Sequence, residues 1–326
     1  MNFRTQVELP EKQTEIRHSD QLMFFGSCFA ENIAHLLEEH KFRCDVNPFG
    51  VLYNPLSINR ALLRILEGKC YTEDELFSSH GLWHSWMHHS DFSASSVEEC
   101  LGRINARMGK ASDGLRKADW LVMTWGTAYV YVHEESGEVV GNCHKMPDKT
   151  FRRLRSNVEA FVEECRSVLE KCRKVNPKLK VLLTVSPIRH AKDGMHANQL
   201  SKATLLLAAE ELCRTCPDCF YFPSYEIVMD ELRDYRFYAD DMVHPSPLAI
   251  DYIWQRFSEY AFNTTTRQLI EQIARITQAA EHKPFEPTSE AHKRFCRQKL
   301  SQIEELNRAY PTLDFGKEIE AFCKYL

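Results

Sequence analysis

The chain has 326 residues, 44% of them hydrophobic, which is enough for a substantial buried core. Acidic residues outnumber basic ones by 46 to 41, and neither sign gathers into long runs, so the composition favours neither a nucleic-acid partner nor an anionic membrane. No stretch approaches the roughly 18 apolar residues of a membrane-spanning helix, and the N-terminal segment lacks the apolar centre of a secretory signal. These features predict a globular, cytoplasmic protein that binds a small molecule.

Short apolar runs alternate with helical periodicities over most of the chain. Strands are predicted at 21–25, 42–46, 120–125, 181–187 and within 219–225, with a hairpin over 128–145. Helices are predicted from Phe29 onward, over 56–66, 158–172 and 198–214, and after Ser246. Apolar strands separated by helices are typical of a parallel sheet covered on both faces, so the pattern predicts an α/β fold, a three-layer α/β/α sandwich over residues 1–262.

The last part of the chain has a different character. After about residue 263 it becomes polar and helical, with a break at HKPFEPTSE. We expect residues 263–326 to form a helical extension packed on the α/β domain. No internal repeat is evident.

The twelve cysteines are scattered along the chain, and several occupy apolar helix positions, such as Cys165 and Cys172. A disulfide framework is typical of short secreted chains with small cores, so reduced thiols are expected here.

The segments that follow the predicted strands hold the residues with chemical potential. In parallel sheets ligands bind at the carboxyl ends of the strands. These segments contain Gly26-Ser27-Cys28, Gly50, Gly126-Thr127, Arg189-His190 and the acidic stretch that ends at His244.

Two of these segments together predict nucleophilic catalysis. Asp241 and His244 are three residues apart just before the last helix of the domain, so the carboxylate can orient the imidazole; Asp240 is an alternative partner. A hydroxyl or thiol at the turn of Ser27 and Cys28 would lie at a helix N-terminus, where unpaired N–H groups and the helix dipole stabilise negative charge. If both segments meet at one rim of the sheet, they form a nucleophile, a base and its orienting carboxylate.

Six segments resemble the GSCFA family, which is grouped with the SGNH (GDSL-like) hydrolases. They are GSCFAENI, NPFGVLYNP, TWGTAYVY, NCHK, TVSPIRH and YFPSYEIVMDELRDYRFYADDMVHPS. The resemblance covers most of the chain and implies a flavodoxin-like α/β/α sandwich and an ester hydrolase or acyl-transfer activity.

The resemblance also implies roles for single residues, with one departure at the first turn. SGNH enzymes carry Gly-Asp-Ser there, with the nucleophile two positions after the glycine. An ungapped match places Gly26 on the glycine and Cys28 on the nucleophile. Ser27 remains the alternative nucleophile if the turn differs by one residue.

A second departure concerns the groups that would stabilise an oxyanion. The family pattern implies a glycine at Gly50, but Ala128 replaces the asparagine expected two residues after Gly126. Asn54 and Asn142 are alternative donors. Losing one oxyanion donor typically costs ~2.7–4 kcal/mol of transition-state stabilisation. Either another group replaces this donor, or the chemistry is weaker or different.

Several residues also have purely structural interpretations. The turn at Ser27 and Cys28 is also typical of a helix N-cap, closed by Glu31 if Cys28 is the cap. Arg189 and His190 would bind an anionic or carbonyl group of the substrate, or else pair with acidic residues. The histidines of HGLWHSWMHH, at 80, 84, 88 and 89, lack further ligand types nearby and favour an aromatic loop or substrate wall over a metal site.

The sequence therefore predicts a hydrolase acting on an acyl ester of a small molecule, with carbohydrate as one substrate class. The predicted catalytic residues are Cys28 or Ser27, His244 and Asp241, and the substrate or oxyanion residues are Gly50, Gly126, Asn142, Arg189 and His190. Neither a metal nor a cofactor is expected. The alternatives are an acyltransferase that uses a Cys28 thioester and a non-catalytic carbohydrate-binding protein.

Overall fold

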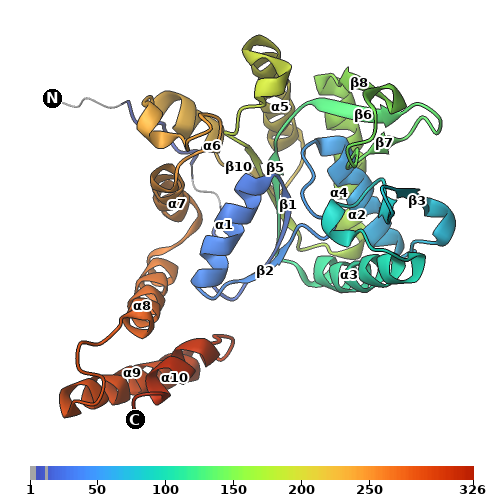
Figure 1. The fold of residues 1–326 in the computed structure, drawn as a ribbon. Coiled ribbons are helices and arrows are strands. Elements are labelled where there is room, and N and C mark those ends of the chain that lie inside the picture. The colour runs from blue at the N-terminus through green and yellow to red at the C-terminus, as the bar shows by residue number, and fades with distance from the viewer. Residues whose placement is uncertain (1–4, 12–13) are drawn as a thin grey trace.

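A parallel sheet forms the centre of the computed structural model, which describes residues 5–11 and 14–326. Its strand order is β10-β9-β5-β1-β2, and every neighbouring pair is parallel (Figure 1). The strands are β1 (Gln21–Gly26), β2 (Arg43–Val46), β5 (Trp120–Trp125), β9 (Lys180–Val185) and β10 (Cys219–Tyr221). All five fall within or beside the segments predicted as strands.

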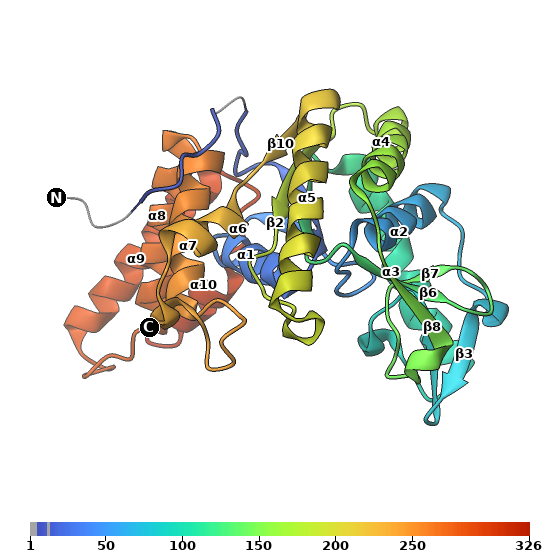
Figure 2. The same cartoon turned by 90° about the horizontal axis from the view of Figure 1, so that it is seen from above.

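Helices cover both faces of this sheet, which confirms the predicted three-layer α/β sandwich (Figure 2). On one face lie α1 (Cys28–Glu39) and α7 (Pro247–Ala261); on the other lie α2 (Pro55–Glu67), α3 (Val97–Lys117), α4 (Val158–Val175) and α5 (Met195–Thr215). Side chains alternate across a strand. Thus Leu22 and Phe24 of β1 pack toward α1 and α7, while Met23 and Phe25 pack toward the other layer.

Two small antiparallel sheets extend from the main domain. The predicted hairpin is present as β6 (Tyr129–His133) and β7 (Val139–Val140), and β8 (Phe151–Arg155) pairs with the other edge of β6. The hairpin of β3 (Leu76–Ser79) and β4 (Leu82–Ser85) is separate. Because β6 follows β5 after three residues, the first of these sheets stands beside the carboxyl ends of the central strands.

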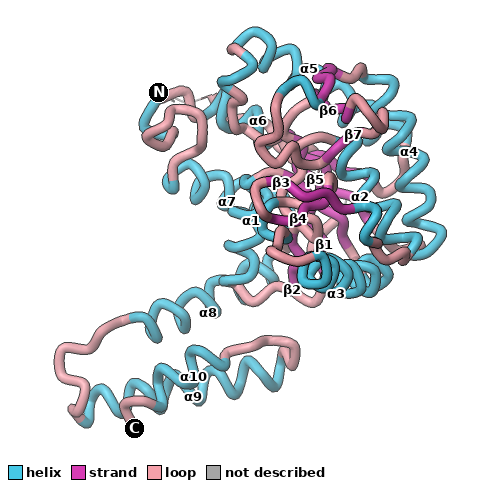
Figure 3. The backbone as a smooth tube through the Cα atoms, turned by 45° about the vertical axis from the view of Figure 1, so that its right-hand side comes forward, coloured by secondary structure: helices cyan, strands magenta, loops and turns pink. Residues whose placement is uncertain are grey.

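The C-terminal helices are α8 (Thr264–Glu281), α9 (Glu290–Ala309) and α10 (Gly316–Cys323). They share a small apolar core that includes Ile273 and Phe322, and Figure 3 shows α9 and α10 running side by side. In Figure 1 they lie on the side of the molecule away from β6, β7 and β8. The predicted boundary between residues 262 and 263 stays a prediction.

Contacts of Ile270 and Glu318 help to tie this extension to the α/β domain. Ile270 of α8 belongs to the core under α1 and α7, and Lys41 Nζ lies 2.6 Å from Glu318 Oε1 of α10.

A short helix, α6 (Ser224–Glu226), continues into a π-helical turn before α7. Among the described helices, none combines the length and the apolar character needed to cross a membrane.

Candidate active site

The turn that joins β1 to α1 depends on a glycine. Gly26 has a φ of +152°, and a Cβ at this position would lie 2.4 Å from the carbonyl oxygen of Thr124 on β5. Its N–H donates to Asn47 Oδ1 at 2.9 Å. Any side chain here would push β1 away from β5, so the sharp turn that presents residues 27 and 28 requires Gly26.

Ser27 is the N-cap of α1. It is only 1% exposed, and its Oγ accepts from the N–H of Phe29 at 3.3 Å and donates to Ser186 Oγ at 3.2 Å. The helix-start interpretation of this turn is therefore met by Ser27 rather than by Cys28. The proposed closure by Glu31 is absent, because its carboxylate accepts from Asn47 Nδ2 instead.

Cys28 is the first residue of α1 and is partly exposed, with its side chain in a cavity. Burial, and then the nearby Glu31 carboxylate, raise the pKa of the Cys28 thiol, while its own backbone N–H and the Tyr53 hydroxyl lower it. The helix N-terminus therefore does not by itself hold Cys28 as a thiolate. A nucleophilic role for Cys28 would require a base that removes the thiol proton.

Asp241 and His244 form the predicted pair. His244 Nδ1 lies 2.5 Å from Asp241 Oδ2, and Asp241 Oδ1 accepts the backbone N–H groups of Val243 and His244, both at 3.0 Å. These bonds, led by the His244 N–H, lower the pKa of Asp241 to about 2. A charged Asp241 assigns the proton to Nδ1 and leaves Nε2 as the proton acceptor.

Cys28 and His244 line the same cavity at the carboxyl ends of the strands. It has a volume of about 550 Å³, and its walls come from the segments after β1, β5 and β9, the segment before α7, and the sheet of β6, β7 and β8. No hydrogen bond joins Cys28 Sγ to the imidazole, although both residues belong to the described part of the chain. Catalytic contacts are often long before substrate binds.

Two expected oxyanion groups are already engaged elsewhere. Gly50 does not line the cavity: its N–H donates to Asn47 O at 2.7 Å, and a Cβ on it would lie 2.2 Å from His89 Cβ. The Gly126 N–H donates to Tyr53 O at 2.8 Å. The structure thus uses both glycines to position loops, and neither amide is free to receive an oxyanion.

Asn54 is one of the two alternative donors, Asn54 and Asn142, that the sequence named without placing them. It caps α2, and its Oδ1 accepts from the Ser57 N–H at 2.8 Å, while its Nδ2 has no partner among the described residues and borders the cavity. Asn142 also lines the cavity, with its Oδ1 accepting from the His144 N–H at 2.8 Å. Ala128 is fully buried, and both Asn54 and Asn142 keep an Nδ2 without a partner among the described residues at the cavity wall.

Arg189 and His190 both reach the cavity. The guanidinium of Arg189 contacts the sulfur of Met229 at 2.9 Å and pairs with no carboxylate of the described residues. His190 is largely buried, and burial, followed by the charges of Lys202 and Arg153, lowers its pKa to about 4. His190 is therefore neutral at neutral pH.

Lys202 is a site residue that the sequence analysis missed. It is 1% exposed on α5, and its Nζ donates to the carbonyl oxygens of Gly126 and Ser186, each at 2.6 Å. Burial lowers its pKa to about 7. The sequence feature that could have identified it is its position between Asn198 and Leu205 on the buried face of a helix, because a buried lysine needs polar partners.

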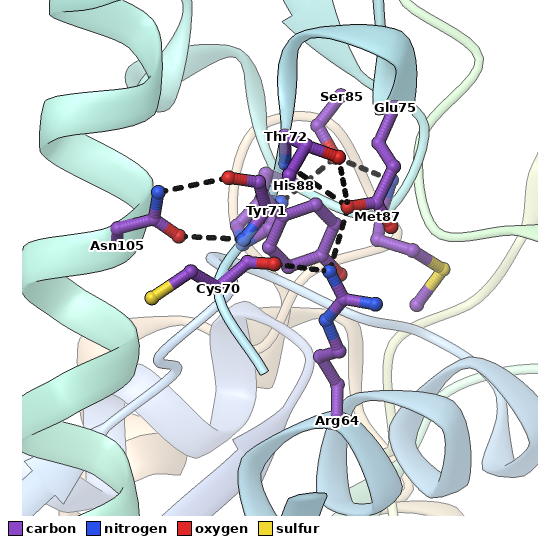
Figure 4. Close-up of polar contacts among 9 residues, drawn as sticks. All are labelled: Arg64, Cys70, Tyr71, Thr72, Glu75, Ser85, Met87, His88 and Asn105. Atoms are coloured by element: carbon purple, nitrogen blue, oxygen red, sulfur yellow. Dashed lines mark hydrogen bonds and ion pairs between the residues drawn. The ribbon is translucent and has the colours of Figure 1, made fainter. Parts of the chain in front are cut away.

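The histidine stretch forms one strand of a hairpin and the loop that follows it. His88 is almost completely buried, stacks on Phe49 at 4.3 Å and bonds through Nδ1 to Ser85 Oγ at 2.9 Å, as Figure 4 shows for the Ser85 contact. Burial lowers its pKa to about 3. Within the ranges that the structure describes, no three His, Cys, Asp or Glu side chains could share a metal ion.

Comparisons with known proteins place the chain in a family. The model of the GSCFA family matches residues 21–257. The chain belongs to the GSCFA family. A second model, described as the C-terminal domain of GSCFA domain proteins, matches residues 273–326.

The other comparisons are distant. No curated protein matches the chain. Among solved structures, an acetyl xylan esterase (Est2A) from the rumen bacterium Butyrivibrio proteoclasticus is 10% identical with a TM-score of 0.36. The match covers 76% of this chain and 64% of the esterase, less than two thirds of that protein. A likeness at this level carries no argument about function.

Proposed function

We propose that this GSCFA-family chain is an SGNH-like hydrolase of acyl esters in which Cys28 is the nucleophile. The observation that carries the proposal is the convergence of a partly exposed Cys28 and the Asp241–His244 pair on one cavity. Ser27 is unsuited to the same role because its hydroxyl caps α1 and is buried against Ser186.

The reaction follows from the protonation states. His244 Nε2 takes the proton of the Cys28 thiol as the sulfur attacks the ester carbonyl, and the charged Asp241 stabilises the resulting imidazolium. His244 then protonates the departing alkoxide, which leaves a thioester on Cys28. Water, deprotonated by His244, attacks the thioester and releases the carboxylic acid and the free thiol.

Two donors are proposed for the oxyanion. They are the backbone N–H of Cys28 at the start of α1 and the Asn54 Nδ2 that has no partner among the described residues. Donors fixed by a helix start and a helix cap need no reorganisation during the reaction. Replacing Asn54 should therefore lower kcat more than it raises KM.

The walls of the cavity suggest the substrate class. Tyr53, Tyr129 and Tyr131 line it, and tyrosine offers an apolar face together with a hydroxyl. Such walls suit the faces and hydroxyls of a sugar ring, so an acylated carbohydrate is the proposed substrate class.

The test is acylation by an activated neutral ester. The wild-type chain, Cys28→Ala and His244→Asn are mixed with p-nitrophenyl acetate, and nitrophenol release and intact mass are followed. Cys323→Ala is the control, because Cys323 is exposed in the C-terminal extension and reports adventitious thiol acylation. We expect one acetyl group on wild type and on Cys323→Ala, none on Cys28→Ala, and slow labelling of His244→Asn. Stoichiometric labelling of Cys28→Ala would refute the nucleophile.

Two other functions remain as alternatives to hydrolysis. A thioester passes its acyl group readily to amines and alcohols, so addition of glycerol or glucosamine to the same assay would reveal an acyltransferase by an acylated acceptor. Ala128 at the donor position supports the second alternative, a non-catalytic binding protein. That function predicts carbohydrate binding without any acyl adduct.

A further inference from the structure

A second cavity lies beside the proposed active site, and Arg189 lines both. The second cavity has a volume of about 320 Å³, and its wall is rich in thioether and phenol side chains. These are Met195, Met229, Tyr235, Tyr238 and Met242. Met242 and Tyr235 are largely exposed, so an apolar ligand could reach this wall from solvent.

The guanidinium of Arg189 has no anionic partner among residues 5–11 and 14–326. Its Nη1 lies 2.9 Å from Met229 Sδ, its Nη2 lies 4.0 Å from Met195 Sδ, and its buried Nε has no partner within the described residues. Thioether sulfurs are weak acceptors, whereas a guanidinium offers five N–H donors. Most of the hydrogen-bonding capacity of this side chain is therefore unused.

Neighbouring arginines differ in this respect. Arg153 pairs with Asp193, and Arg233, on the wall of the second cavity, pairs with Asp230 at 3.5 Å. The protein itself neutralises Arg153 and Arg233, whereas no described carboxylate pairs with Arg189 at its position between the two cavities.

The charge balance of the active-site cavity is positive. Its walls carry three cationic side chains, Arg153, Arg189 and Lys192, against one carboxylate, Asp193, which gives a balance of 3 − 1 = +2. The whole chain has a formal net charge of −5. A local excess of positive charge in an acidic protein favours an anionic ligand at this place.

We propose that Arg189 binds an anionic group of the substrate, a carboxylate or a phosphate, while the wall of methionines and tyrosines receives the apolar part beside that group. This inference rests on the proposed function, since it adds an anionic group with an apolar part beside it to the acylated carbohydrate proposed for the same site. The planar guanidinium binds either group through two parallel N–H bonds. The flexible methionine side chains can adapt to an alkyl chain.

Backbone contacts make Arg189 a suitable residue to replace. Its N–H donates to the Val243 carbonyl at 3.2 Å, which holds the loop of His244, and this bond is independent of the side chain. Arg189→Gln and Arg189→Lys therefore keep the loop contact. Circular dichroism and thermal unfolding would confirm that both variants fold.

The first experiment measures equilibrium binding by calorimetry with hexanoate, hexyl phosphate and hexanol. We expect hexanoate or hexyl phosphate to bind more tightly than hexanol. Arg189→Gln should lower the affinity for the tighter-binding anion by about tenfold or more. The affinity of Arg189→Lys for this anion should lie between those of wild type and Arg189→Gln, because lysine keeps the charge but not the paired donors. Arg275→Gln is the control: it removes the same charge from an exposed position on α8.

The second experiment uses the reactivity of Cys28 without any ester. Iodoacetate and iodoacetamide alkylate a thiolate at the same kind of carbon, but only iodoacetate carries a negative charge. Site-resolved mass spectrometry gives the ratio of the two rates at Cys28. We expect Arg189→Gln to lower this ratio by about tenfold, and Arg275→Gln to leave it unchanged.

The outcomes separate the two proposals. Equal binding of hexanol and both anions, or binding and alkylation ratios that do not respond to Arg189→Gln, would overturn the anion site even if p-nitrophenyl acetate acylates Cys28. Arg189-dependent anion binding without any acylation would support the anion site and refute the hydrolase. The tighter of the two anions identifies the recognised group as a carboxylate or a phosphate.

Discussion

Ser27 and Cys28 are adjacent, and the structure predicts opposite consequences of replacing them. Ser27→Ala removes the N-cap bond to Phe29 and the bond donated to the buried Ser186 hydroxyl. Loss of an N-cap costs ~0.5–2 kcal/mol, and a buried hydroxyl left with fewer partners costs about as much again. We therefore expect Ser27→Ala to lower the free energy of unfolding by about 1–3 kcal/mol.

Cys28→Ala should have little effect on stability but should remove the reactive side chain of the turn. The Cys28 side chain is partly exposed in the cavity and only flanks the core under α1 and α7. Its truncation should lower the free energy of unfolding by less than about 1 kcal/mol, because folding buries only part of the surface of this thiol. Reaction with chloroacetamide at this turn, in contrast, should disappear in Cys28→Ala and persist in Ser27→Ala.

The assay combines urea denaturation, followed by circular dichroism, with intact-mass measurement after chloroacetamide treatment under native conditions. Cys70→Ala is a suitable control, because Cys70 is exposed and its label should be lost without an effect on either stability or Cys28. A Ser27→Ala variant as stable as wild type would refute the capping role. Loss of labelling at residue 28 in a folded Ser27→Ala variant would refute the division of roles between the two residues.

Three further predictions follow from packing and charge. Gly26→Ala should yield little folded protein, measured by soluble expression and circular dichroism, because its Cβ would lie 2.4 Å from the Thr124 carbonyl oxygen. Burial lowers the pKa of Lys202 from 10.5 to about 7, so the unfolded chain binds more protons between these values and Lys202 costs stability as pH falls from 10 to 7. Urea denaturation at pH 7 and 9 should therefore show a larger gain with pH for wild type than for Lys202→Met, and equal gains would contradict the assignment. Lys41→Met should destabilise the C-terminal helices by about 1–3 kcal/mol by leaving the buried Glu318 carboxylate without its cation, which hydrogen exchange of α10 would detect.

The sequence contained enough local information to predict the three layers, the first turn with Cys28 and the pair of Asp241 and His244. The apolar run before Gly26 and the periodicity from Phe29 predict a strand, a tight turn and a helix, and these are the observed β1 and α1. The spacing of Asp241 and His244 predicts their contact, since both partners lie in one short loop. Signals of this kind depend only on neighbours along the chain.

Features that depend on distant segments were not predictable in the same way. The engagement of Gly50 by Asn47 and its close approach to His89 arise from the way three segments pack. Asn54 gave no sign that one end of its amide caps α2 while the other borders the cavity. Likewise, residues 80–89 contain helix-like histidine spacing, yet cross-strand pairing with Leu76–Ser79 turns part of the stretch into a hairpin.

Lys202 explains how these separate loops act as one site. Its amine donates to the carbonyl oxygens of Gly126 and Ser186, which directly follow β5 and β9, and Ser186 Oγ accepts from Ser27 Oγ after β1. Burial lowers the pKa of Lys202 to about 7, and the two carbonyl oxygens supply the polar partners that its buried amine needs. The carboxyl ends of three strands are thereby linked beneath the cavity. Cys28 is left as the nucleophilic side chain of the first turn that is not used in this linkage.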